Sequence, residues 1–430
     1  MFNICVDSCK VNWKVFFFFY KKIRQKIIKL FYKRGDEVNA VENIERLVKE
    51  YFEEKVEISD KTVTNNCIGA LVNENNYDEF KRNFEERLSR ISSKITDSSQ
   101  RENVVDKIKN LAEEKGYKWS GPYSELVALD FFLSSDYIAE PCFINCFESS
   151  RYPESLPARN KRKTIDIDFS FEFKTNKFYT DVKSLIPMQI EIFDTIIDNV
   201  IKEIPNKRIL IGVDDLKPES MIDFQKVVQN EKAAIERELL KGIQSSKNKV
   251  IYTSQEGIQY VFRISYNGIL TTMHSKSPYE LARFDKYKYL NYYNKLLDTD
   301  YTLLTFVLNP WFNRQIDDFA CFNEIYYRSV CRRVFMEFKD DKTPANTLFK
   351  SIKDITITIS DISRNIAGIL FIEDKSVKKD DDGLLYKAYL YLNPNYKNKD
   401  SLKEHDFSSA FDYSSFAKMM KIDDFQDDNY

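Results

Sequence analysis

The chain has 430 residues, of which 43% are hydrophobic and 31% charged, so it can form packed cores and is neither fibrous nor wholly disordered. The formal net charge of −2 excludes an overall basic field that would indicate a nucleic-acid partner. Two histidines and the lack of GxxxxGK and GxGxxG loops argue against most histidine-based catalytic or zinc sites and against common nucleotide-binding sites. The length predicts two or three domains.

Residues 1–34 combine an aromatic run, VFFFFY, with nine Lys or Arg residues against one acid, Asp7. The apolar run is far shorter than the ~20 residues needed to span a bilayer, so we expect no transmembrane segment here. Three interpretations stay open: a helix docked on the protein, a helix on a membrane surface, or a nucleic-acid contact.

The seven cysteines are scattered, and none is in a CxxC motif. This usage predicts a reducing, cytoplasmic location. The pairs Cys5/Cys9 and Cys142/Cys146 could hold zinc if the fold joined them, but buried thiols are the simpler interpretation.

Apolar residues at helical spacing predict helices across residues 36–118, and Gly121 and Pro122 suit the start of a further helix. Residues Thr164–Phe173 then alternate, with Ile165, Ile167, Phe169, Phe171 and Phe173 on one face, which predicts a strand. The KTNK turn and FYTDVKSLI predict the return strand of a hairpin. A helix in QIEIFDTIIDNVIKEI and a buried strand in KRILIGV are expected next.

Beyond residue 215 the patterns are weaker. We expect a long helix in residues 220–243, a second hairpin from KVIYT and YVFRISY, and a buried strand in TLLTFVL. A helix in FNEIYYRSVCRRVFMEF and strands in ITITIS and AGILFIED follow, with a solvated loop at 375–383 and an acidic tail.

Carboxylates occupy the polar face of the first hairpin. With a turn centred on Thr175 and Asn176, Ser170 lies opposite Asp181, so Asp168 and Asp181 become diagonal neighbours. Two such carboxylates can hold one hard cation, which would polarise a phosphodiester and its attacking water. Lys183, on the same strand face as Asp181, can orient or deprotonate that water or stabilise phosphoryl charge. Glu125, beside the buried face of its helix, could assist a second cation, or it could simply stabilise the helix N-terminus.

These residues resemble the PD-(D/E)xK nuclease superfamily, which has the restriction-endonuclease-like fold, over about Asn110–Val213. The resemblance implies Mg²⁺ (or Mn²⁺) at Asp168, Asp181, Val182 and Glu125, with Lys183, Asp181, Asp168 and Glu125 as the catalytic set. Ile167 stands where the family's proline would be, and Asp181 replaces the commoner Glu.

Rival acid–lysine pairs exist, because [DE]xK is a common triplet in a chain this charged. Glu172 with Lys174 has no upstream strand acid, whereas Glu373 with Lys375 follows Asp354 and Asp361 and is the better rival. The other alternative is that the hairpin acids are ordinary solvent-facing residues.

A basic segment precedes the first strand and could track a phosphate backbone, or it could be a solvated loop. It contains Arg151, Arg159, Lys161, Arg162 and Lys163.

We therefore expect an α/β protein with a restriction-endonuclease-like central mixed sheet flanked by helices. Its regions would be residues 1–105 (helical, with a basic aromatic start), 106–215 (nuclease core) and 216–430 (mixed α/β, able to complete the sheet). The expected function is metal-dependent phosphodiester hydrolysis, in DNA before RNA, by a homodimer or with a partner protein. By family analogy it would serve restriction or anti-phage defence. The alternative is an inactive nucleic-acid-binding or scaffold protein with the same fold.

Overall fold

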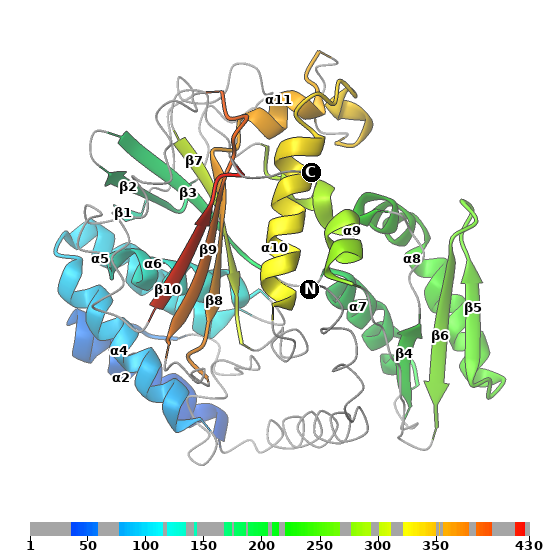
Figure 1. Ribbon diagram of the computed structural model, residues 1–430. Coiled ribbons are helices and arrows are strands. Elements are labelled where there is room, and N and C mark those ends of the chain that lie inside the picture. Colours follow the sequence, from blue (N-terminus) through cyan, green and yellow to red (C-terminus); the bar gives the residue numbers. More distant parts are fainter. Residues whose placement is uncertain are drawn as a thin grey trace, which may run out of the picture.

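The structure is a computed structural model with a mixed α/β fold (Figure 1). It describes residues 36–58, 77–114, 118–134, 142–143, 167–173, 176–185, 188–204, 209–214, 220–266, 277–293, 301–310, 321–349, 352, 356–377, 384–397 and 418–425.

Two sheets organise the described residues. The strands of the larger sheet are β1 (Cys142–Phe143), β2 (Phe169–Phe173), β3 (Asn176–Ser184), β7 (Tyr301–Leu308), β8 (Gly368–Asp374), β9 (Tyr386–Leu392) and β10 (Lys418–Asp423). Within the described residues these seven strands follow the order β1-β2-β3-β7-β8-β9-β10. β3, β7 and β8 are mutually parallel, as are β9 and β10, whereas β1, β2 and β3 form an antiparallel meander and β8 pairs antiparallel with β9. The central strand β7, YTLLTFVL, is apolar almost throughout because both of its faces are covered.

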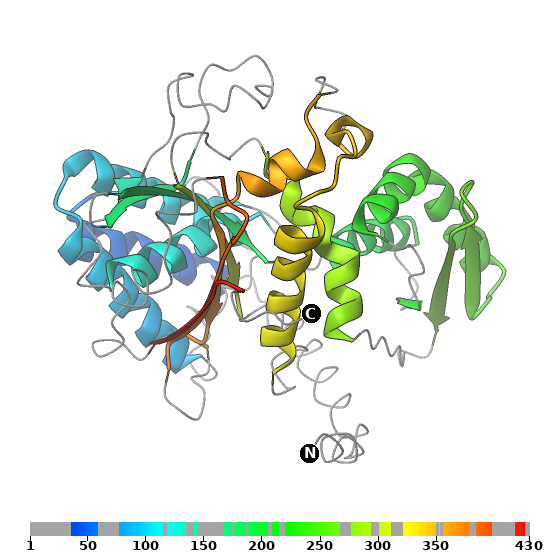
Figure 2. The ribbon, with the colours of Figure 1, turned by 45° about the horizontal axis from the view of Figure 1, so that its top comes forward.

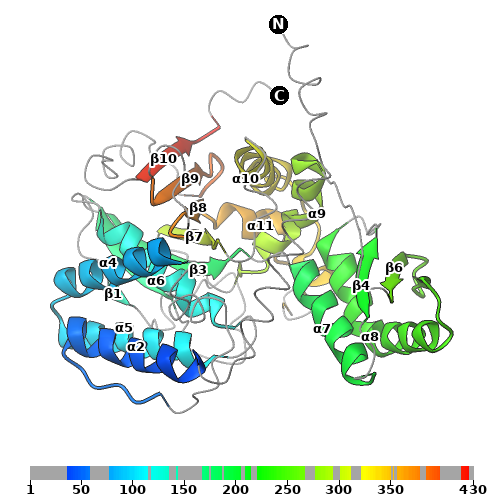
Figure 3. The same cartoon turned by 90° about the horizontal axis from the view of Figure 1, so that it is seen from below.

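Helices cover both faces of this sheet (Figure 2). One face carries α2 (Asp36–Phe52), α4 (Asp78–Lys94), α5 (Ser98–Glu113) and α6 (Ser120–Leu133). The other carries α9 (Pro278–Leu290), α10 (Phe322–Arg332) with its π-helical turn Arg333–Glu337, and α11 (Ile359–Arg364). Figure 3 shows the layering, in which α6 packs on β3 and β7 while α2 packs on α4 and α5. The core on the α6 side runs from Ile44 to Tyr396 and so draws on all three regions expected from the sequence.

A second, smaller sheet lies beside this body (Figure 1). β4 (Leu210–Asp214), β5 (Lys249–Thr253) and β6 (Gln259–Ser265) pair antiparallel in the order β4-β6-β5. Helices α7 (Met188–Lys202) and α8 (Met221–Gln244) pack on it around Phe193, Phe224 and Phe262. The elements from α7 to β6 thus form a distinct unit, and β7 takes the place beside β3.

Most expected elements are confirmed, but three interpretations are wrong. The described part of KRILIGV forms β4 in the smaller sheet, where Leu210 is exposed, so it is not the buried strand that was expected. ITITIS does not form a strand, because Thr358 caps α11 through a capping box with Asp361. Ile167 packs in the core opposite to the one that holds Phe169 and Phe171, because the chain bends at Asp168.

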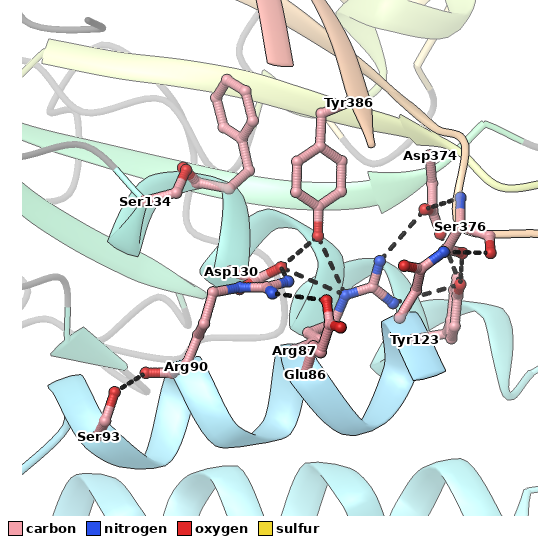
Figure 4. Close-up of polar contacts among 12 residues, drawn as sticks. Glu86, Arg87, Arg90, Ser93, Tyr123, Asp130, Ser134, Asp374, Ser376 and Tyr386 are labelled. Carbon is pink, nitrogen blue, oxygen red and sulfur yellow. Dashed lines mark hydrogen bonds and ion pairs between the residues drawn. The ribbon is translucent and has the colours of Figure 1, made fainter. Parts of the chain in front are cut away.

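A buried polar network ties the N-terminal helices to the sheet (Figure 4). Arg87 of α4 is fully buried and contacts Asp374 of β8 at 3.2 Å, Asp130 of α6 at 3.6 Å and the Tyr386 hydroxyl of β9 at 3.1 Å. The hydroxyl of Tyr123 donates to Asp374 at 2.5 Å. Arg90 forks onto both carboxylate oxygens of Asp130 at 2.8 and 2.7 Å. Two guanidinium groups and two carboxylates thus balance one another inside the core, so this network is structural.

Candidate functional site

The predicted acids lie where β2 and β3 begin to part. The observed register pairs Ser170 with Tyr179 and Phe169 with Thr180, so it is shifted by two residues from the expected pairing of Ser170 with Asp181. A two-residue shift preserves the faces but changes the partners. Extended by one step, this register places Asp168 directly opposite Asp181, which corrects the expected diagonal.

Asp168 lies at the bend just before β2, and its carboxylate bonds to the neighbouring strand. Its Oδ2 accepts a hydrogen bond from the backbone N–H of Val182 at 2.6 Å. The side chain therefore takes the place of a ladder partner and is held at the level of the β3 backbone. This contact fixes the carboxylate between the two faces of the sheet.

Asp181 and Lys183 form the second part of the site. Asp181 is completely buried, and its Oδ2 lies 2.6 Å from Nζ of Lys183, which is also 3.9 Å from Oδ2 of Asp168. The same ammonium donates to the carbonyl oxygen of Val182 at 3.0 Å. It also lies 5.7 Å from the ring centroid of Tyr292, which follows α9. The Lys183 ammonium thus lies between the two acids and beside the aromatic ring of Tyr292.

Glu125 approaches from α6, on the opposite face of the sheet. It forms an ion pair with Lys107 of α5, and both side chains are largely buried. The residues next to Glu125 in the helix, Leu126 and Val127, are fully buried, so the helix has little freedom to move this carboxylate. Asp168 is the acid whose pKa is affected both by Asp181 on the neighbouring strand and by Glu125 on the other face of the sheet.

The electrostatics reflect this crowding. Burial first, and then the negative charges of Asp181 and Glu125, raise the pKa of Asp168 to about 7, against the opposing effect of Lys183. Burial alone would lower the pKa of Lys183, but the neighbouring Asp181 and Asp168 outweigh it and raise that pKa above its ordinary value. At neutral pH Lys183 is therefore an ammonium group. Perturbed pairs of this kind are typical of functional sites.

The donor set suits a hard divalent cation. Asp168 and Asp181 offer carboxylate oxygens, Val182 can offer only its backbone carbonyl, and such oxygen ligands are those that Mg²⁺ and Mn²⁺ prefer. Within the described residues, no group of three or more His, Cys, Asp and Glu side chains is arranged to hold a metal ion. Glu125, paired with Lys107, thus does not complete a three-acid cluster with the two aspartates.

The rival pair lies in a different setting. Glu373 at the end of β8 is buried, lies 3.1 Å from Lys375, and accepts from Asn323 at 2.8 Å and Tyr327 at 3.3 Å. Its upstream acid Asp361 serves the α11 cap, and Asp354 lies outside the described residues. Glu172 is on β2, paired in register with Lys177. Glu373 is therefore saturated by structural contacts.

Several expected contributors fall outside the described residues. They are residues 1–34 and the basic positions Arg151, Arg159, Lys161, Arg162 and Lys163, together with Cys5, Cys9 and Cys146. In the part of the chain that the structure describes, no helix combines the length and apolar character needed to cross a membrane.

Sequence reasoning missed Lys107 and Tyr292, which come from elements distant in the chain. It also missed the bond between the hydroxyls of Thr180 and Thr305, 2.6 Å long and fully buried, which joins β3 to β7 next to Asp181. No local pattern marks these residues, because each acquires its role only through tertiary packing. The sequence of α5 does not distinguish Lys107 from its neighbour Lys109.

No protein-family model matches this chain, and it has no match among curated proteins or solved structures.

Proposed function

We propose that this protein is a Mg²⁺- or Mn²⁺-dependent nuclease with a restriction-endonuclease-like core that hydrolyses phosphodiester bonds, with DNA as the expected substrate and RNA as the alternative. The observation that carries the proposal is the convergence of Asp168, Asp181 and the Lys183 ammonium where β2 and β3 part. Around them, α6 on one face and the antiparallel pair β2 and β3, continued by the parallel strand β7, are compatible with such a core, with α7 and β4 set apart in the smaller unit.

The charge balance at the aspartates favours a cation. Burial, and after it the charges of Asp181 and Glu125, raise the pKa of Asp168 to about 7, and a divalent ion would relieve the repulsion between these carboxylates. Asp168 and Asp181 would hold the ion, beside the Val182 carbonyl that accepts a hydrogen bond from the Lys183 ammonium. When bound, such an ion supplies a water of lowered pKa and neutralises charge on the phosphate.

Lys183 has a separate role. Because the two aspartates raise its pKa, Lys183 carries its proton at neutral pH in the metal-free protein. Its ammonium, fixed by Asp181 and the Tyr292 ring, can stabilise the negative charge that develops on the phosphoryl oxygens. Of the roles expected for this lysine, charge stabilisation is the one that the geometry supports best.

The test is a cleavage assay of the full chain on supercoiled plasmid, linear DNA and RNA in Mg²⁺ or Mn²⁺. We expect cleavage by the wild type and losses of about 100-fold or more for Asp181→Asn and Lys183→Gln. Lys375→Gln, at the rival pair, is the matched control and is expected to keep full activity. Equal activity of the wild type, Asp181→Asn and Lys183→Gln would remove the site.

One observation favours the alternative of an inactive binding or scaffold protein. The ammonium of Lys183 lies 2.6 Å from Asp181, so this acid is already neutralised without a metal. If the wild type binds nucleic acid but cleaves neither DNA nor RNA with either metal, this alternative holds.

A further inference from the structure

Lys107 is the least expected charge at the site. It lies on α5, a helix that contributes no other side chain to the cluster, and its Nζ forms an ion pair with Oε2 of Glu125. The exposed fractions of the two side chains are 25% and 13%, so the pair is largely removed from water. An ion pair in such a position constrains Glu125 far more than an exposed pair would.

The charges at the site leave room for one divalent ion. Three carboxylates, those of Glu125, Asp168 and Asp181, face two ammonium groups, those of Lys107 and Lys183. With all five ionised the site carries a charge of −1, and one divalent cation brings it to +1, which balances one phosphodiester. A second divalent cation would leave a large uncompensated positive charge in a partly buried site, which is costly.

The ion pairs divide the three acids into two groups. Asp168 and Asp181 share the Lys183 ammonium, whereas Glu125 is held by Lys107 from the other face of the sheet. The described residues contain no metal-holding group of three acids, although Glu125 is close enough to act on the charge of Asp168. The ammonium of Lys107 already neutralises the charge of Glu125.

From this arrangement we propose that Lys107 takes the place of a second metal ion, so that the site binds a single divalent cation at Asp168 and Asp181. Lys107 is thus a positioning residue that holds Glu125 and neutralises its charge. The inference rests on the proposed function, because it assumes that the two aspartates bind a cation.

The experiment counts Mn²⁺ bound per full-length chain from the electron paramagnetic resonance signal of free Mn²⁺, without substrate. The wild type and Lys109→Met, a matched lysine on the same helix, are expected to bind one Mn²⁺. Lys107→Met is expected to bind a second ion through Glu125, or to bind the first about tenfold more tightly or better, because an opposing charge is gone. The double variant Lys107→Met with Glu125→Gln should return to one ion. Circular dichroism confirms that each variant is folded, and Lys107→Gln replaces Lys107→Met if the latter is not.

Two outcomes overturn the inference alone: two Mn²⁺ bound by the wild type, or a Lys107→Met variant that matches the wild type in number and affinity. In both cases Mn²⁺ still binds, and Asp181→Asn still abolishes binding at the first site, so the proposed function survives. If the wild type binds no Mn²⁺ at all, both the proposed function and the inference fail.

Discussion

The carboxylate of Asp168 and the backbone N–H of Val182 form a 2.6 Å hydrogen bond that joins the start of β2 to the middle of the Asp181–Lys183 triplet. This bond holds a negative charge beside Asp181, where repulsion and burial both oppose it. The strand pairing thus maintains an electrostatically unfavourable arrangement, which is common in functional sites and costs stability.

The first prediction concerns pH. The pKa of Asp168 is about 7 in the folded protein against 3.8 ordinarily, because of burial and then the charges of Asp181 and Glu125. The folded state therefore retains a proton that the unfolded state loses, so this contribution to stability is complete below about pH 4 and is lost as pH rises through about 7. Asp168→Asn, which keeps the acceptor for Val182, should be more stable than the wild type at pH 8, by up to about 4 kcal/mol.

Urea unfolding in metal-free buffer at pH 5 and pH 8 checks this. The advantage of Asp168→Asn should grow between the two values. Asp340→Asn, which alters an exposed carboxylate, should show no such growth. A constant difference across this pH range would mean that Asp168 is ionised throughout.

The second prediction concerns Tyr292, whose ring lies 5.7 Å from Nζ of Lys183 and 5.7 Å from the ring of Phe306. Tyr292→Leu removes the aromatic face and should lower the cleavage rate about 3- to 30-fold, which corresponds to a cation–π contact of ~0.5–2 kcal/mol. Tyr292→Phe keeps the ring and should retain the activity. A loss in the phenylalanine variant equal to that in the leucine variant would assign the effect to the hydroxyl instead.

Local patterns located the site, but tertiary packing set its geometry. The alternation around Phe169 and Phe171 and the position of Asp181 on the opposite face could be read from a period of two. The register could not, because a shift by two residues keeps every side chain on its face. The bend at Asp168, which turns Ile167 toward the other core, could not be predicted either, because the alternation of apolar and polar residues continues through it.

The arrangement of strands in the sheets was also hard to predict from the sequence, because it depends on contacts between residues far apart in the chain. β7 pairs with β3 across more than a hundred residues, and KRILIGV, expected within the nuclease core, pairs in the smaller sheet instead. In the sequence, nothing distinguishes Arg87 from the other charged residues of its polar helix. Its burial follows only from the positions of Asp374 and Tyr386, which lie almost three hundred residues further along the chain.

The third prediction tests the link between β3 and β7 next to the site. The hydroxyls of Thr180 and Thr305 are buried and lie 2.6 Å apart. Thr305→Val or Thr180→Val alone should destabilise the protein by about 1–3 kcal/mol, because a buried hydroxyl loses its partner. The double variant replaces both hydroxyls with methyl groups of similar size and should cost less than the sum of the two. Additive losses in chemical denaturation would show that the two hydroxyls do not depend on each other.

The fourth prediction concerns Arg87, which joins α4 to β8 and β9 through the buried network of Figure 4. Arg87→Met should lower the free energy of unfolding by about 3–5 kcal/mol, because it leaves the carboxylate of Asp374 buried without its cation. Arg46→Met breaks ion pairs with Glu50 and Glu85 that are half exposed, and should change stability by less than about 1 kcal/mol. Adding Asp374→Asn to Arg87→Met should recover part of the loss, because the uncompensated charge is removed. If Arg87→Met unfolds at the same denaturant concentration as Arg46→Met, the network does not hold the N-terminal helices against the sheet.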